Sequence, residues 1–298
     1  MSTSALAAGA RPPWLRAAPV VFLLIWSGSF VFLKRGLQDA DPLTFLALRW
    51  VSVVAILLVA FAWVRPRLPA SGGAWGKLAV MGLLLQAGYL IGTYLSLKLG
   101  VSAGAVALIT SQQPILIGLL APAVAGERVG AVRWAGLLLG VLGACVVIVA
   151  NAAIDIAAPA GLFFSVLALL SLSASTLWEK RYGVVTHPIT ANLVQCSAAL
   201  LVVAPLAWLL EPMRVHWTPA LLGSLAYLVF GTSLVAITLL LAMIRHGEAS
   251  RVSGLFFLVP PATALIAHGV LGEAMAPLAW AGMALAAMGI YLVMRRAR

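Results

Sequence analysis

Long apolar runs recur along the whole chain and are separated by short connections. A helix needs about 20 apolar residues to cross the hydrocarbon core of a bilayer. The connections are rich in Pro, Gly, Asp and Arg, and none is long enough for a separate soluble domain. The pattern therefore predicts an all-α integral membrane protein with ten transmembrane helices, at 17–33, 42–64, 78–97, 101–125, 134–151, 157–178, 189–210, 218–244, 252–271 and 276–294.

Composition supports a membrane protein and argues against a soluble one. The chain is 63% hydrophobic and 9% charged, whereas soluble domains carry about 25% charged residues. The net charge of +11 does not indicate nucleic-acid binding, because the basic residues lie in short gaps between apolar runs and form no patch. Cys145 and Cys196 both fall within apolar runs, where cysteine packs as a small hydrophobe. We expect a multi-pass protein of the cell (inner) membrane, with no nucleic-acid partner, cofactor or metal.

The basic residues predict the orientation, because cytoplasmic loops of membrane proteins are enriched in Lys and Arg. With both termini cytoplasmic, the four residues Lys34, Arg35, Lys98 and Arg214 lie outside and Arg49 lies within a span. The other fourteen lie inside: Arg11, Arg16, Arg65, Arg67, Lys77, Arg128, Arg133, Lys180, Arg181, Arg245, Arg251, Arg295, Arg296 and Arg298. We therefore expect cytoplasmic tails at 1–16 and 295–298.

The two halves of the chain repeat each other at a shift of 146 residues. Lys34-Arg35 falls on Lys180-Arg181, Gly126-Glu127 falls on Gly272-Glu273, and Trp134 falls on Trp280. Each copy, 17–151 and 157–294, holds five predicted spans. Because five is odd, the second copy must enter the membrane from the opposite side. This predicts two inverted five-helix repeats, the symmetry that lets one site open to either face.

Three segments of the chain resemble a known family. The resemblance also extends over the stretches between them and covers about residues 17–296. The three segments are LIWSGSFVFLKRGL…DPLTFLALRW, GVSAGAVALITSQQPILIGLLAPAVAGERV…RWAGLLLGVLGACVVI and RHGEASRVSGLFFLVPPATALIAHGVLGEAMAPLAWAGMALAAMGIYLVM. The chain resembles the EamA family of the drug/metabolite transporter superfamily, and the doubled Gly-Glu followed by Trp-x-Gly is its most specific mark. The resemblance implies ten helices in two inverted repeats around a central cavity. It also implies a carrier that often exports amino acids or small metabolites.

A polar stretch with a helix breaker interrupts the fourth apolar run. Thr110, Ser111, Gln112 and Gln113 precede Pro114, and proline removes a backbone donor and crowds the preceding turn. The second copy repeats the breaker as Pro260-Pro261, preceded by Phe256 and Phe257. Interrupted segments at matching positions point to a transporter site, so we expect Gln112, Gln113 and Phe257 to border a cavity. The alternative is a kink for helix packing, with the glutamines bonding neighbouring helices.

Other polar side chains predict the rest of the cavity. In the third span, Gln86, Tyr89, Thr93 and Ser96 follow helical spacing and lie on one face. Their alternative role is hydrogen bonding between helices. The candidate lining adds polar and aromatic residues of the first, sixth and eighth spans, namely Trp26, Ser29, Ser175, Tyr227 and Thr232. Trp26 could instead lie in the aromatic belt at the membrane interface.

Single charges are further candidates. Arg49 lies about two turns into the second span, and a charged residue inside the membrane is a functional candidate by default. It could bind a substrate carboxylate, or reach the interface or Asp41 instead. The doubling of Gly-Glu favours a structural role for Glu127 and Glu273, as a helix cap or a loop anchor. Small-residue runs such as Gly136-x-x-x-Gly140 and Gly282-x-x-x-Ala286 suit close helix contact, within one chain or in a homodimer.

The leading hypothesis is a secondary transporter, acting as an exporter, for small organic metabolites such as amino acids or related compounds. Nucleotide-sugar carriers would need more embedded cations, and multidrug cation exporters would need an embedded acid. A membrane enzyme would need clustered catalytic groups at membrane depth, and the spans offer no carboxylate pair or His-x-x-x-His motif. A non-transporting partner subunit stays open. The eight acidic residues all lie in loops or at span ends. We therefore expect transport to be either facilitated down the substrate gradient or coupled through a site other than a carboxylate at mid-membrane, with Glu179 and His268 as the candidates for coupling.

Overall fold

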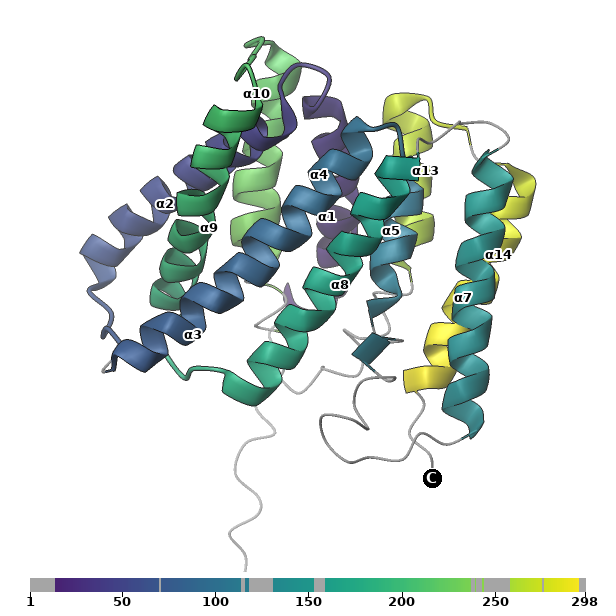
Figure 1. The fold of residues 1–298 in the computed structure, drawn as a ribbon, viewed down its shortest axis with the longest axis horizontal. Helices are drawn as coiled ribbons and strands as arrows, with labels where there is room; N and C mark the ends of the chain where they lie inside the picture. The colour runs from purple at the N-terminus through teal and green to yellow at the C-terminus, as the bar shows by residue number, and fades with distance from the viewer. Residues whose placement is uncertain are drawn as a thin grey trace, which may run out of the picture.

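The structure is a computed structural model of the 298-residue chain. It describes residues 14–69, 71–113, 116–117, 131–152, 159–236, 239, 243, 258–274 and 276–294. These residues form helices joined by short loops (Figure 1). Within these ranges, the one strand-like feature is an antiparallel bridge between Ala40 and Val215. The all-α prediction is confirmed.

The helices follow the apolar runs closely. They are α1 (Trp14–Gly36), α2 (Pro42–Val64), α3 (Gly72–Gly82), η1 (Leu83–Tyr89), α4 (Leu90–Lys98), α5 (Ala103–Ser111), α7 (Ala131–Ala152), α8 (Pro159–Tyr182), α9 (Pro188–Leu210), α10 (Pro219–Ala226), η2 (Tyr227–Ala236), α13 (Val259–Leu271) and α14 (Pro277–Met294). Segments α3, η1 and α4 form one continuous span, as do α10 and η2.

Six of the described helices are long and apolar enough to cross a membrane, and three more apolar helices are shorter. The predicted fourth span is described mainly over α5, since most residues beyond Gln113 lie outside the described ranges. A multi-pass membrane protein therefore agrees with the structure. The count of ten spans and the inverted repeat stay predictions.

Local chemistry explains where the helices begin. Proline is the first residue of α2, α9 and α10, and its fixed φ and missing N–H suit the first helical turn. The side chains of Ser71, Ser102 and Thr218 accept hydrogen bonds from the backbone N–H three residues on, as N-cap residues do. Helix α13 ends at Leu271, and the C-cap residue Gly272 has a φ of 68°, in the left-handed region, which glycine adopts without steric cost because it has no Cβ.

Helices α7 and α14 form a closely packed pair beside the rest of the bundle (Figure 1). A Cβ at Gly282 would lie 2.8 Å from the carbonyl oxygen of Gly143, and a Cβ at Gly289 would lie 2.6 Å from that of Gly136. Glycine is therefore needed for the backbones to approach this closely. From the sequence, the small-residue runs could serve helix contacts either within one chain or between two chains. In the structure they pack α7 against α14 within one chain.

The remaining described helices share a core of large side chains. Trp50, Phe45, Tyr94 and Leu228 are among those fully enclosed. Helix α2 packs on α9, α4 packs on α8, and α1 packs on α13. In each of these three pairs, a helix from the first half of the chain lies against one from the second half.

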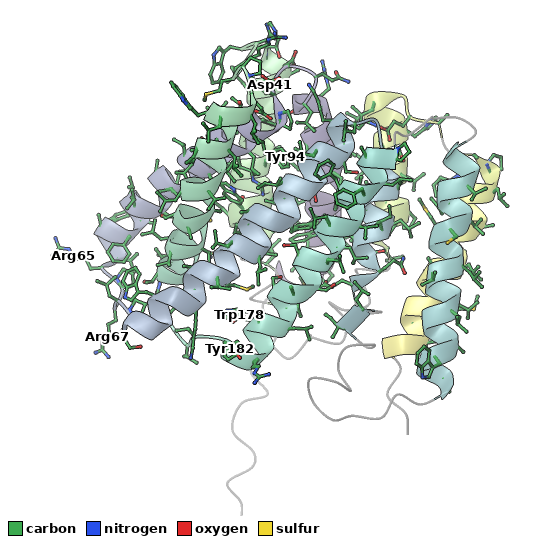
Figure 2. All side chains as sticks on the ribbon, in the orientation of Figure 1. Asp41, Arg65, Arg67, Tyr94, Trp178 and Tyr182 are labelled. Atoms are coloured by element: carbon green, nitrogen blue, oxygen red, sulfur yellow. The ribbon has the colours of Figure 1, made fainter. Side chains whose placement is uncertain are left out.

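One end of the bundle is closed by contacts between the two halves, and we call it the capped end. It consists of the described residues 36–41, 98–102, 211–218, 272–274 and 276, and Asp41 marks it in Figure 2. Glu211 accepts hydrogen bonds from the backbone N–H groups of Leu43 and Thr44, each at 2.8 Å. A carboxylate at a helix N-terminus satisfies free donors and complements the helix dipole. Glu211 thus caps α2 from the other half.

Glu273 plays the same part for α5. Its Oε2 accepts a hydrogen bond from the backbone N–H of Ala103 at 3.2 Å, and its Oε1 lies 2.5 Å from Lys34 Nζ. The prediction that Glu273 is a structural cap is therefore confirmed. The equivalent Glu127 lies outside the described residues.

Candidate functional site

Arg49 is buried in the middle of the bundle, with 6% of its surface exposed. Its Nη2 donates to Ser233 Oγ at 3.1 Å, its Nη1 lies 3.5 Å from Tyr94 Oη, and its guanidinium lies 5.0 Å from the centre of the Trp50 ring. These groups partly replace water, and the aromatic ring attracts the cation. Within the described part of the chain, Arg49 Nε has no hydrogen-bond partner, and Arg49 forms no ion pair with Asp41.

The larger of two cavities beside Arg49 has a volume of about 310 Å³. It runs along α2 from Arg49 to Ala60, close to the last residue of that helix, Val64. The opposite wall is the start of α9, with Pro188, Asn192 and Cys196. The cavity therefore extends from mid-bundle towards the end opposite the capped end.

The smaller cavity, about 90 Å³, lies on the other side of Arg49 and Gln86, which line both cavities. Its wall holds six of the predicted site residues besides Arg49, and they come from α1, η1, α4 and η2: Trp26, Ser29, Gln86, Tyr89, Thr93 and Thr232. Residues far apart in sequence thus meet around one guanidinium group.

Two π-helical segments, η1 and η2, supply much of this lining. A π-helix makes i→i+5 bonds, occurs rarely and is frequent at functional sites. In η2, Ser233 Oγ donates to the carbonyl of Leu228, five residues earlier, at 3.0 Å. In η1, the carbonyl of Gln86 accepts from Trp50 Nε1 at 3.1 Å. The wider turns are thus held by side chains, and they present both Gln86 and Ser233 to the larger cavity.

The four polar residues on one face of the third predicted span have two different roles. Gln86, Tyr89 and Thr93 line the smaller cavity. Ser96 is fully buried against α8, where its Oγ lies 2.5 Å from Ser165 Oγ. The cavity and the packing interpretations therefore each hold for part of the stripe.

Gln112, Gln113 and Ser175 are not among the described residues that line the two cavities. Gln113 Nε2 donates to Thr176 Oγ1 at 2.5 Å and to the carbonyl of Leu172 at 3.2 Å, both on α8. Gln112 Nε2 and Ser175 Oγ bond to backbone carbonyls of their own helices. These contacts favour the packing interpretation, although the buried Gln112 Oε1 has no partner within the described ranges.

The other candidates lie away from Arg49 or outside the described residues. Tyr227 Oη donates to the carbonyl of Ile25 at 3.1 Å, and its ring stacks on Phe32. Pro260 and Pro261 lie in the first turn of α13, which suits proline. Phe257 and Pro114 lie outside the described residues.

Neither candidate for coupling lines the two cavities. Glu179 is exposed near the end of α8, in the turn that carries Trp178 and Tyr182 (Figure 2). His268 is exposed near the capped end, and its Nδ1 lies 2.9 Å from the carbonyl oxygen of Glu273. The ring is therefore placed to help end α13.

Sequence reasoning missed Trp50, Asn192 and Cys196 as lining residues. The spacing of Pro188, Asn192 and Cys196 is four residues, so they share one helical face. This spacing could have indicated that the three residues lie together on one side of α9. Its meeting with α2 depends on long-range packing, which one sequence does not reveal.

The candidate site is thus a buried cation between two cavities in a bundle of apolar helices, which is the architecture of a multi-pass membrane protein with internal cavities. The model of the EamA-like transporter family matches residues 17–149 and 159–295. The chain belongs to this family, within the drug/metabolite transporter superfamily.

Curated relatives span almost the whole chain. A probable amino-acid metabolite efflux pump of Salmonella typhimurium is 28% identical over 287 residues, covering 92% of each chain. A protein of the same description from Escherichia coli is 26% identical over 286 residues, again covering 92% of each. A solved crystal structure has a TM-score of 0.65 at 19% identity, covering 94% of this chain and 96% of that chain, which supports the fold. The family and these names indicate a transporter.

Proposed function

We propose that the protein is a secondary transporter that exports small organic metabolites, with amino acids or related carboxylates as first candidates. The observation that carries this proposal is Arg49, a buried guanidinium that borders both cavities and has no acidic partner among the residues described. A cation at membrane depth is costly. A substrate carboxylate would supply the missing charge and accept bidentate hydrogen bonds.

The two ends of the bundle support an alternating-access mechanism. Cross-half contacts of Glu211 and Glu273 hold the capped end together, while the larger cavity reaches towards the other end. In the orientation proposed from the basic residues, the capped end is external, both termini are cytoplasmic and the cavity opens inward. An inward-facing site is the state in which an exporter collects its substrate.

The inverted repeat would supply the opposite state. The two family matches, 17–149 and 159–295, support the division of the chain into two similar halves. Exchanging the conformations of two such halves opens the external end and closes the internal one. The naming of two relatives as amino-acid metabolite efflux pumps supports the substrate class.

The test is counterflow in proteoliposomes with the full chain. Vesicles are loaded with one unlabelled amino acid or organic acid, and entry of the same labelled compound is followed. Transient accumulation with at least one carboxylate, absent from protein-free vesicles, is the expected result. No accumulation with any member of a broad panel would contradict the proposal and favour a non-transporting partner subunit.

A further inference from the structure

A third hollow lies outside the Arg49 site, in the surface formed by α2, α3 and α9, and we call it the lateral groove. Its volume is about 630 Å³, within the range of roughly 300–1,000 Å³ for pockets that bury small organic ligands. Its lining is largely apolar and includes Val54, Leu58, Phe61, Trp75, Leu193 and Val194. Leu58 is 52% exposed and Leu201, also in the lining, is 76% exposed. The groove therefore opens at the surface that would face lipid.

The loop after α2 crosses one end of the lateral groove and is tied to its walls. The carbonyl of Arg67 accepts from Thr190 Oγ1 at 3.4 Å, and the carbonyl of Pro69 accepts from Trp75 Nε1 at 3.3 Å. Thr190 and Trp75 both line the groove. The loop therefore holds Arg67 at the mouth, and Arg65 follows one turn after Phe61, whose carbonyl accepts from Arg65 N at 2.8 Å.

Both arginine side chains are exposed at the end of the bundle far from Asp41 (Figure 2). No hydrogen bond or ion pair of either guanidinium is present within the described ranges. The sequence has no Asp or Glu between 42 and 126, and α9 has none. The elements that form the groove therefore carry positive charge at its mouth without a neutralising carboxylate.

We propose that the lateral groove binds an anionic phospholipid of the cytoplasmic leaflet. One acyl chain lies along the apolar lining, and the phosphate is bound by Arg65 and Arg67. Basic side chains next to a membrane span attract anionic headgroups, and guanidinium binds phosphate in bidentate fashion. Trp75 at the mouth suits the interface, where tryptophan is enriched. The orientation is the one proposed above; the site itself does not depend on transport.

The bound lipid would contact α2 and α9 on the side of these helices opposite the larger Arg49 cavity. On α2, Ile56 and Ala60 line the larger Arg49 cavity, while Leu58 and Phe61 line the groove. On α9, Asn192 and Cys196 face the cavity, while Leu193 and Ser197 face the groove. Two helices thus separate the lipid from the substrate site.

Native mass spectrometry of the full chain in a neutral detergent tests the proposal. Phosphatidylglycerol and phosphatidylcholine with identical acyl chains are titrated separately. Each arginine near a charged headgroup contributes about fivefold in affinity. We expect phosphatidylglycerol to bind at least tenfold more tightly to the wild type, and the preference to fall to about twofold or less in Arg65→Gln/Arg67→Gln. The control Lys180→Gln/Arg181→Gln removes the same charge from the end of α8 and should keep the preference.

A second arm separates a lipid site from a free-phosphate site and from a general effect of charge. Ala79→Phe places a ring in the groove and should weaken binding of both lipids, with Ser197→Phe as the substitute if that variant fails to fold. Glycerol phosphate at millimolar concentration should not compete. Equal binding of the two lipids by the wild type would overturn the proposal, as would competition by glycerol phosphate or a preference that survives loss of both arginines.

Discussion

Lys34 Nζ lies 2.5 Å from Glu273 Oε1, and this ion pair joins α1 of the first half to the loop that follows α13 in the second. The same ammonium group donates to the carbonyl of Val101 at 3.2 Å. One side chain therefore connects α1, the start of α5 and the end of α13. If the capped end opens during transport, these bonds must break.

Replacing Lys34 with Met should favour opening of the capped end. Loss of a partly buried, charge-assisted hydrogen bond costs about 1.5 kcal/mol or more, which is roughly a tenfold shift in population. Leu33 lines the smaller cavity near this end, so Leu33→Cys reports the opening in a Cys145→Ser/Cys196→Ala background. Labelling by an external, membrane-impermeant maleimide should accelerate about tenfold. Arg35→Gln is the control, since Arg35 in α1 bonds to Gln38 in the loop directly after that helix. Equal labelling rates in Lys34→Met and in the background protein with Lys34 would show that the Lys34 bonds do not hold the capped end closed.

Glu211 should contribute to stability through its cap on α2. Glu211→Ala removes the acceptor for the N–H groups of Leu43 and Thr44, and loss of a cap costs about 1 kcal/mol, up to about 2. The melting temperature in detergent should fall by a few degrees. Glu179→Ala, at an exposed position on α8, should leave it nearly unchanged. A similar fall in both variants would show that Glu211 acts only through the net charge of the chain.

The α7–α14 pair predicts a contrast between two glycines. Gly282→Val should destabilise by roughly 2 kcal/mol or more, because its Cβ would lie 2.8 Å from both the Gly143 carbonyl oxygen and the Val147 side chain. Gly269→Ala in α13 meets no atom within 4 Å, so it should be neutral or stabilise by up to about 1 kcal/mol. Thermal unfolding of both variants measures the difference. Equal melting temperatures would contradict the close packing of this pair.

The sequence predicted the helices and part of the site for different physical reasons. Apolar runs predict spans because lipid requires them, so α2 and α9 match their runs within a few residues. Arg49 could be identified because charge is rare inside membranes. The sequence did not identify Asn192 and Trp50 as lining residues, because their role depends on which helices pack together.

Local helix geometry explains the remaining differences. An ideal α-helix would keep Ser96 on the face of Gln86, but η1 changes the phase between them, and Ser96 packs on Ser165. Gln113 has the polarity of a lining residue, and its amide is taken by α8. Polarity within a span predicts that a side chain avoids lipid, while the choice between water and a neighbouring helix is decided by packing.

Variants of Glu179 and His268 test whether either residue couples transport to the proton gradient. Neither side chain lines the Arg49 cavities, so we expect Glu179→Gln and His268→Ala to keep wild-type transport under an imposed pH gradient, within about twofold. The measurement is substrate accumulation in proteoliposomes with and without the gradient. Proton-driven accumulation that disappears in either variant would assign the coupling to that residue.

The central claim is that the substrate carboxylate binds Arg49 within the cavities, and counterflow by Arg49 variants tests it most directly. Arg49→Gln keeps a hydrogen-bonding group but removes the charge, and Arg49→Lys keeps the charge but not the bidentate geometry. For a carboxylate substrate transported by the wild type, Arg49→Gln should lower transport at least tenfold, with Arg49→Lys between the two, at protein levels matched by a folded-state assay. Folded Arg49→Gln protein that transports the same carboxylate at the wild-type rate and affinity would contradict the account.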